Sequence, residues 1–192
     1  MTDGERWAAS ELDALRGRRF RPRAWHRFLA ASLRRAAETR RARPPLARQA
    51  RRWSILGLWA GLAVGAGAPS ARVPAPRRRS FALWWTAVCA MLEWHLGMVE
   101  GPRGEPRDRL TAADALTLGR LWSLPLLAAQ GDPADGSAAA FTALIVCAGA
   151  SDALDGALAR RVGTTRLGRD LDKAADALLV GVASRTARRA GW

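Results

Sequence analysis

Four aspartates at fixed spacings in the last third of the chain could hold a divalent metal ion. They belong to the pattern D-x-x-D-G-x-x-A-R-x7-G-x3-D-x3-D, which runs from Asp152 to Asp176. Asp152 and Asp155 are three residues apart, and Asp172 and Asp176 are four apart, so each pair would share one face of a helix. Both pairs border apolar stretches, where four carboxylates would repel one another strongly unless a cation neutralises them. Lys173, the only lysine, cannot do this alone.

The residue types around these acids favour a hard metal ion and phosphoryl transfer. Carboxylate oxygens without a nearby histidine select Mg²⁺ or Mn²⁺ rather than Zn²⁺. Gly156 and Ala159 leave room for a ligand, and Arg160 and Thr165 offer groups that bind phosphate. Gly168 would let the chain turn into the second helix. In phosphoryl transfer, positioning and charge neutralisation supply most of the catalysis.

Taken singly, each acid also has a structural explanation. Asp152 and Asp172 could be helix N-caps, and the other acids could lie on solvated helix faces. A chance match to all eight specified positions, however, has a probability on the order of one in a hundred million per starting residue. The complete pattern therefore favours the chemical interpretation.

The pattern resembles the signature of the CDP-alcohol phosphatidyltransferases, integral membrane enzymes of phospholipid synthesis. These enzymes move a phosphatidyl group from CDP-diacylglycerol, or a related CDP-alcohol, to a small hydroxyl acceptor and release CMP. The resemblance implies that Asp152, Asp155 and Asp172 bind the metal ions. It implies that Asp176 is the general base on the acceptor hydroxyl and touches one ion. The implied contacts to the CDP moiety are Gly156, Arg160 and Thr165, with Gly168 packed close to it.

A weaker match lies upstream. Asp114-Ala115-Leu116-Thr117, followed by Arg120, is similar to the start of the family's first core helix, where Asn or Asp and a Thr three residues later lie near the nucleotide. Asp114 and Thr117 are therefore further candidates for substrate binding. Thr111 and Asp114 before an apolar run also form an ordinary capping box, so the match is informative only beside the stronger pattern.

The resemblance covers residues 110–192 and has departures. Seven residues separate Arg160 from Gly168, one fewer than the commonest family spacing, and Lys173 follows the third acid where Pro is frequent. The family core has six transmembrane helices, and the chain reaches only the third. We therefore expect a C-terminally incomplete core. The acceptor alcohol, a homodimer and the activity of this chain stay open, and an inactive truncated relative is one alternative.

Three helices must position these residues, and the sequence predicts them at about 111–130, 137–160 and 169–189. The connection from Gln130 to Ser137 has acids but no Lys or Arg, whereas residues 103–109 and 161–168 carry arginines. The positive-inside rule puts the two arginine-bearing segments in the cytoplasm. We therefore expect a multi-pass protein of the inner cell membrane, with its active site and N-terminus facing the cytoplasm.

The segment before this core is strongly basic and then apolar. Residues 1–52 contain fifteen arginines and five acids, and apolar residues recur at helical spacing from Trp25 to Ala36. This pattern fits an amphipathic helix on an anionic membrane, a flexible basic arm, or a solvated arm without a specific role. Pro44-Pro45 predicts a helix break. Of the apolar runs that follow, 53–68 is short for a membrane span and 81–99 is long enough.

The expected fold is an all-α, multi-pass integral membrane helical bundle with a basic N-terminal arm. Its parts are the arm at 1–52, two apolar helices within 53–101 that either span the membrane or are re-entrant, and the first three helices of the phosphatidyltransferase core at 110–192. The formal net charge of +14 requires an anionic partner. A non-catalytic basic helical protein that binds anionic membrane or nucleic acid is the competing hypothesis. No DNA- or RNA-binding signature is present, so we do not expect nucleic acid as a partner.

Overall fold

The computed structural model describes residues 2–67, 75–129 and 137–189, and these residues form an all-helical protein without strands. The predicted all-α class is confirmed. Its elements are α1 (Asp3–Gly17), α2 (Pro22–Ala42), α3 (Pro44–Gly67), α4 (Ala75–Trp94), the short 3-10 helix η1 (Leu96–Met98), α5 (Ala112–Ala129), α6 (Ser137–Val162) and α7 (Arg166–Arg189). The three helices predicted for the core correspond to α5, α6 and α7. The connection expected at 130–137 lies, up to residue 136, outside the described residues.

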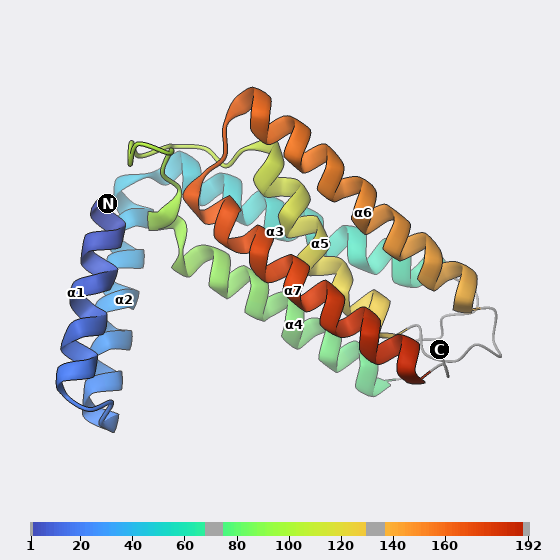
Figure 1. Cartoon of the computed structure of the whole chain (residues 1–192), viewed down its shortest axis with the longest axis horizontal. Helices are drawn as coiled ribbons and strands as arrows, with labels where there is room; N and C mark the ends of the chain where they lie inside the picture. Colours follow the sequence, from blue (N-terminus) through green and yellow to red (C-terminus); the bar gives the residue numbers. More distant parts are fainter. Residues whose placement is uncertain (1, 68–74, 130–136, 190–192) are drawn as a thin grey trace.

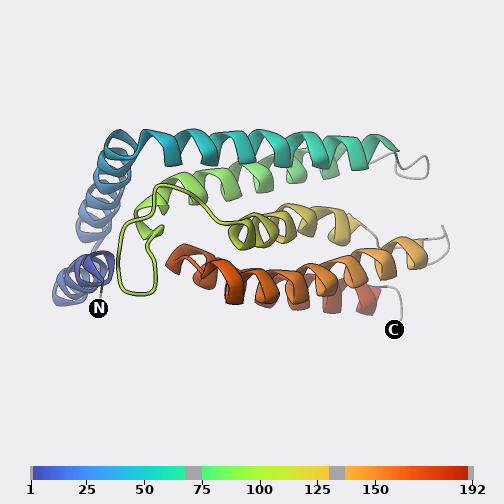
Figure 2. The same ribbon diagram turned by 90° about the horizontal axis from the view of Figure 1, so that it is seen from above.

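Helices α3 to α7 run alongside one another as an elongated bundle, and α1 and α2 form a hairpin that lies crosswise at one end of it (Figures 1 and 2). The same end carries η1, the start of α5 and the connection from α6 to α7. The hairpin is joined to the bundle by a sharp break, because α2 ends at Ala42 and α3 begins at Pro44. This confirms the break predicted from Pro44-Pro45. Helix α3 therefore begins inside the segment assigned to the arm.

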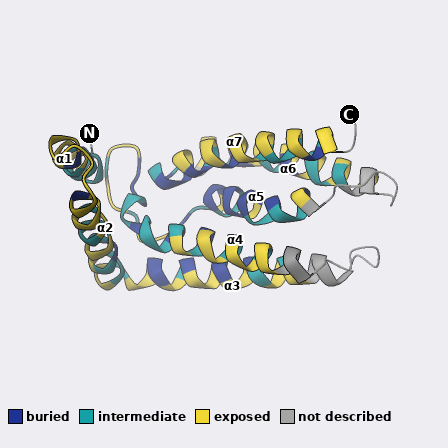
Figure 3. Cartoon of the chain, turned by 90° about the horizontal axis from the view of Figure 1, so that it is seen from below, coloured by how far each residue is buried: buried dark blue, intermediate teal, exposed yellow. Residues whose placement is uncertain are grey.

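Helix α5 is the centre of the bundle and packs against α3, α4, α6 and α7. Leu118, Leu121 and Leu124 recur every three residues and so share a face of α5, where all three are buried. They belong to one apolar core together with Leu167 and Leu171 of α7. Figure 3 shows this buried stripe along α5, between the more exposed helices on either side. The core thus fixes α7 against the helix that carries Asp114 and Thr117.

Many large apolar side chains lie on the outside of the bundle instead of in its core. Those on α3, α4, α6 and α7 are Ile55, Leu56, Trp59, Leu62, Leu83, Val146, Leu154, Leu178 and Val180. Within the described residues, one helical segment, Phe141–Arg161, has the length and apolar composition needed to cross a membrane. The multi-pass part of the predicted fold therefore stays a prediction.

Candidate functional site

The connection from α6 to α7 brings the two halves of the aspartate pattern together. Gly163 adopts a left-handed backbone conformation with φ of +77°, which glycine adopts without steric cost. Two residues later, the Thr165 hydroxyl accepts a hydrogen bond of 2.9 Å from the Gly168 N–H and so caps the start of α7. The expectation that Gly168 makes this turn was wrong, because Gly163 makes the turn and Gly168 lies in the first turn of α7.

Gly168 instead allows α7 to pack closely against α5. A Cβ atom added at this position would overlap the Asp114 Oδ1 atom and lie 3.2 Å from the Thr165 hydroxyl. Asp114 cannot easily move aside, since it is 1% exposed and its Oδ1 accepts a hydrogen bond of 2.8 Å from Thr165. Its Oδ2 accepts another of 2.7 Å from the Thr111 N–H, as the predicted capping box requires. Residue 168 must therefore be glycine for α5 and α7 to approach this closely.

The side chain of Arg120 lies at the centre of the four aspartates. Its Nη1 atom donates to Asp152 and Asp176, each at 2.8 Å, and its Nη2 atom donates to Asp155 at 2.8 Å and to Asp172. The Arg120 side chain is 3% exposed. One guanidinium therefore stands where the sequence predicts a cation between four carboxylates. Its single positive charge leaves a formal charge of −3 on this group of five side chains.

The four carboxylates differ in how open they are. Asp155 is 10% exposed, and the Thr117 hydroxyl holds its Oδ2 atom with a hydrogen bond of 2.8 Å. Asp152, Asp172 and Asp176 are more accessible, and one carboxylate oxygen of each lies within 4.8 Å of the others. Three converging carboxylate oxygens with a negative residual charge suit a hard divalent ion. The residues present therefore fit Mg²⁺ or Mn²⁺.

These aspartates form part of a cavity of about 420 Å³ between α5, α6 and α7. The predicted site residues that line it are Asp114, Thr117, Asp152, Asp155, Gly156, Arg160, Gly168 and Asp172. Ala113, Ala153, Ala159, Thr164 and Arg169 complete the lining. The small residues keep the space open beside the acids, and Arg160 and Arg169 place positive charge on its wall. A phosphate ester with an attached metal ion matches this combination of charges.

Two predicted site residues lie elsewhere. Thr165 is fully buried and does not line the cavity; it donates a hydrogen bond to Asp114, which does, and it caps α7, so it holds two elements of the site in place. Asp176 contacts Arg120 beside the cavity and is 51% exposed. The alternative that Asp152 and Asp172 are helix N-caps is wrong, because both lie inside helices, α6 and α7 respectively.

Sequence reasoning noted Arg120 but gave it no role. Asp114, Thr117 and Arg120 follow one another at intervals of three residues, which places all three on one face of α5. An arginine on the same helix face as two candidate site residues, inside an apolar helix, needs buried acidic partners. That spacing was the signal that could have linked Arg120 to the four aspartates.

Comparison with known proteins agrees with this geometry. The model of the CDP-alcohol phosphatidyltransferase family matches residues 110–190, the part of the chain that contains α5, α6 and α7. These residues form a CDP-alcohol phosphatidyltransferase domain. The family recognised in the sequence is thereby confirmed, over nearly the range expected. No curated protein and no solved structure matches the chain significantly. The phosphatidyltransferase domain belongs to a transferase family of phospholipid synthesis.

Proposed function

We propose that this domain transfers a phosphatidyl group from CDP-diacylglycerol, or a related CDP-alcohol, to a small hydroxyl acceptor with release of CMP. The observation that supports this most strongly is the cavity between α5, α6 and α7. The aspartate pattern of α6 and α7 meets Asp114 and Thr117 of α5 there, although the two segments are separated by more than thirty residues of sequence. A donor diphosphate would lie beside the aspartates, and its nucleoside would extend along the lining.

Mg²⁺ or Mn²⁺ would be held by the four aspartates, Asp152, Asp155, Asp172 and Asp176. When bound, the ion supplies positive charge that neutralises the diphosphate and the departing CMP. Arg120 holds the same carboxylates in fixed positions and already cancels one of their four charges. The buried carboxylate of Asp155 is the one most firmly oriented, by Arg120 and Thr117 together.

The other residues of the chain bind the donor and handle the acceptor proton. Arg160, on the exposed end of α6, is placed to bind a phosphate oxygen. An added Cβ at Gly156 would meet only Arg160, at 3.5 Å, so this glycine leaves space for a ligand. Asp176 would accept the proton of the acceptor hydroxyl. The hydroxyl oxygen then attacks the lipid-side phosphorus, and the bond from this phosphorus to the CMP oxygen breaks.

We also propose that the bundle spans the membrane. Its exterior carries the large apolar side chains described above on four helices, and such side chains contact lipid favourably. The arginines of residues 103–109 and 161–166 lie at the end with the site, which favours a cytoplasmic site. The other end of the bundle also carries arginines, near the end of α7, and by the same rule these oppose this orientation: Arg185, Arg188 and Arg189. Labelling of single cysteines introduced at either end, in intact cells, would decide it.

The chemical proposal is tested by binding of CDP-diacylglycerol to the detergent-purified full chain, with Mg²⁺ or Mn²⁺ and with EDTA. We expect binding that depends on the metal and that Asp152→Asn weakens by roughly 10-fold to 100-fold. Asp170→Asn is the matched control: Asp170 is an exposed acid of α7 that faces Arg166 at 3.9 Å and does not line the cavity. It should bind like the parent chain.

Metal-independent binding, or equal losses in the two variants, would contradict the assignment of the site. Release of CMP on addition of candidate hydroxyl acceptors then identifies the acceptor. Metal-dependent binding without CMP release for any acceptor would show that the chain is an inactive relative that retains its donor site.

A further inference from the structure

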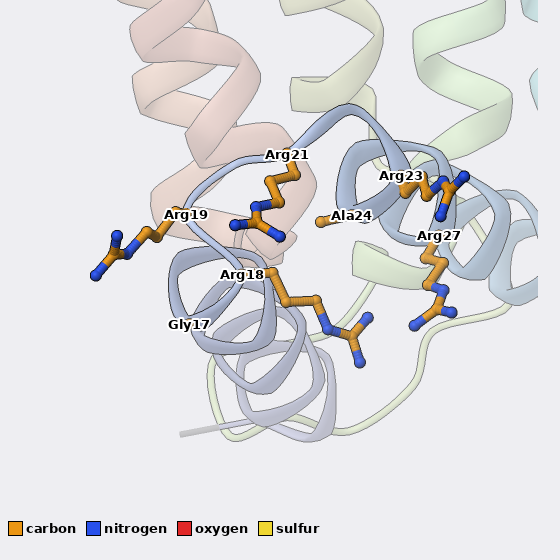
Figure 4. Close-up of a pocket in the computed structure, with 7 residues that line it drawn as sticks. All are labelled: Gly17, Arg18, Arg19, Arg21, Arg23, Ala24 and Arg27. Carbon is orange, nitrogen blue, oxygen red and sulfur yellow. The ribbon is translucent and has the colours of Figure 1, made fainter.

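The turn between α1 and α2 concentrates positive charge far from the proposed active site. Five arginines, Arg18, Arg19, Arg21, Arg23 and Arg27, surround a concave surface with a volume of about 430 Å³, together with Gly17 and Ala24. Figure 4 shows their side chains fanning out from this turn. We call these five residues the arginine cluster. All five are exposed.

The arginine cluster has no internal counter-charge. Within the part of the chain that the structure describes, none of its arginines forms an ion pair, whereas neighbouring Arg16 pairs with Asp13 at 3.5 Å. Five guanidinium groups around one surface repel one another, so an anion bound among them is favourable. Guanidinium groups bind phosphate oxygens in a fork-like geometry. The chemistry of the surface therefore selects a partner with several phosphate groups.

Apolar side chains lie next to these charges. Phe20 and Trp25 are 53% and 43% exposed, with ring centroids 6.4 Å apart, and Trp25 meets Phe28 edge to face. Farther along α2, Leu29 and Leu33 are also exposed. A free phosphate has no apolar part, and a nucleotide base can stack on the two aromatic rings but has nothing to bury against Leu29 and Leu33. A membrane surface offers phosphates and, just below them, acyl chains.

The position of the hairpin matches such a surface. Its inner end is held to the bundle, because Arg166 donates a hydrogen bond of 3.1 Å to the Thr2 hydroxyl and also pairs with Glu5. Its turn projects away from the bundle, at the opposite end of the hairpin (Figures 1 and 2). If the bundle crosses a bilayer along its length, the crosswise hairpin lies along the bilayer surface. The arginine cluster then reaches lipid headgroups beyond the edge of the bundle.

We propose that the arginine cluster is a binding site for the phosphate groups of anionic phospholipids in the membrane that holds the bundle. This inference rests on the membrane-spanning bundle proposed above and is independent of the transfer reaction. Each arginine near an anionic surface strengthens binding about fivefold. Loss of three should therefore weaken the interaction on the order of 100-fold.

The test measures hydrogen–deuterium exchange of residues 17–28 in the full chain, placed in nanodiscs of phosphatidylcholine with or without phosphatidylglycerol. We expect several-fold slower exchange in the anionic nanodiscs, and loss of this difference at high salt because exposed charges are then screened. Replacement of Arg18, Arg19 and Arg21 by Gln should abolish the difference. Replacement of the same three by Lys should retain most of it.

The matched control replaces Arg185, Arg188 and Arg189 by Gln, which removes the same charge at the other end of the bundle. This control should keep the lipid dependence. Equal exchange in both lipids, or an equal effect of the two Gln variants, would overturn the proposal. Protection by inorganic phosphate or by a DNA oligonucleotide in neutral nanodiscs would also overturn it, since either would make the partner a soluble anion. A chain that does not stay in the nanodisc refutes the spanning bundle itself.

Discussion

Because α7 approaches α5 closely at Gly168, we predict that a single added methyl group at this position destabilises the protein. In Gly168→Ala the new Cβ would overlap Asp114 Oδ1, so Asp114 has to move and its hydrogen bond with buried Thr165 is broken. Overpacking of this kind costs about 1–3 kcal/mol, and a buried polar group left without its partner costs about 1–3 kcal/mol more. The better helix propensity of alanine offsets about 1 kcal/mol. We therefore expect Gly168→Ala to lower the free energy of unfolding by about 1–5 kcal/mol.

The assay is thermal unfolding of the full chain in detergent, with CDP-diacylglycerol binding measured on the same samples. A loss of this size corresponds to a decrease in Tm of roughly 2–20 °C. Gly181→Ala is the control, because Gly181 lies on the same helix and an added Cβ there meets no atom within 4 Å. That variant should be unchanged or more stable by about 0.5–1 kcal/mol. If Gly168→Ala unfolds at the temperature of Gly181→Ala, the packing argument is refuted.

Two further predictions concern charge. Arg120→Gln should lower the free energy of unfolding, measured in EDTA, by about 3 kcal/mol, because the four carboxylates lose their counter-charge. Addition of Mg²⁺ should restore most of the lost melting temperature. Arg169→Gln is the control, because Arg169 is an exposed arginine of the cavity wall, and its melting temperature should change little. If Mg²⁺ does not restore the melting temperature of Arg120→Gln, the role given to Arg120 is contradicted. The backbone N–H of Thr2 and the Arg166 guanidinium lower the pKa of Glu5, so the contact between α1 and α7 is complete at neutral pH. This contact should weaken as the pH falls through that lowered pKa. The measurement is hydrogen–deuterium exchange of the amides of residues 3–8, corrected for intrinsic rates, which should become faster. Glu5→Gln should remove this pH dependence.

The sequence was sufficient for the three helices α5, α6 and α7 and for grouping the aspartates on helix faces, because both depend on local spacing. It did not predict α1, and it left open whether the segment of α2 is helical. Aspartates three apart and four apart share helix faces, and the structure places all four around one point. The approximate bounds of α5, α6 and α7 followed from apolar runs between turn residues. Such spacing rules work within one helix, where the geometry is fixed.

What the sequence did not predict depends on contacts between helices. Spacing puts Arg120 on the same face of α5 as Asp114 and Thr117, but it does not show that Arg120 takes the central position, since its partners lie more than thirty residues away. Gly168 and Gly163 look alike in sequence, but one packs against Asp114 and the other makes the turn. Thr165 likewise has the side chain of a phosphate-binding residue, and its burial and its hydrogen bond to Asp114 show that it supports the cavity lining instead.

The order of helices along the chain has a consequence for how the site is made. Every described residue that lines the cavity between α5, α6 and α7 falls between Ala113 and Asp172, on these three consecutive helices or, for Thr164, in the connection between the last two. Contacts between neighbouring helices form early, because the chain that must be closed is short. The proposed donor site can therefore assemble as soon as these three helices have been synthesised. No described residue of the N-terminal hairpin lines the cavity, so the hairpin can change with the membrane that it meets while the lining stays the same.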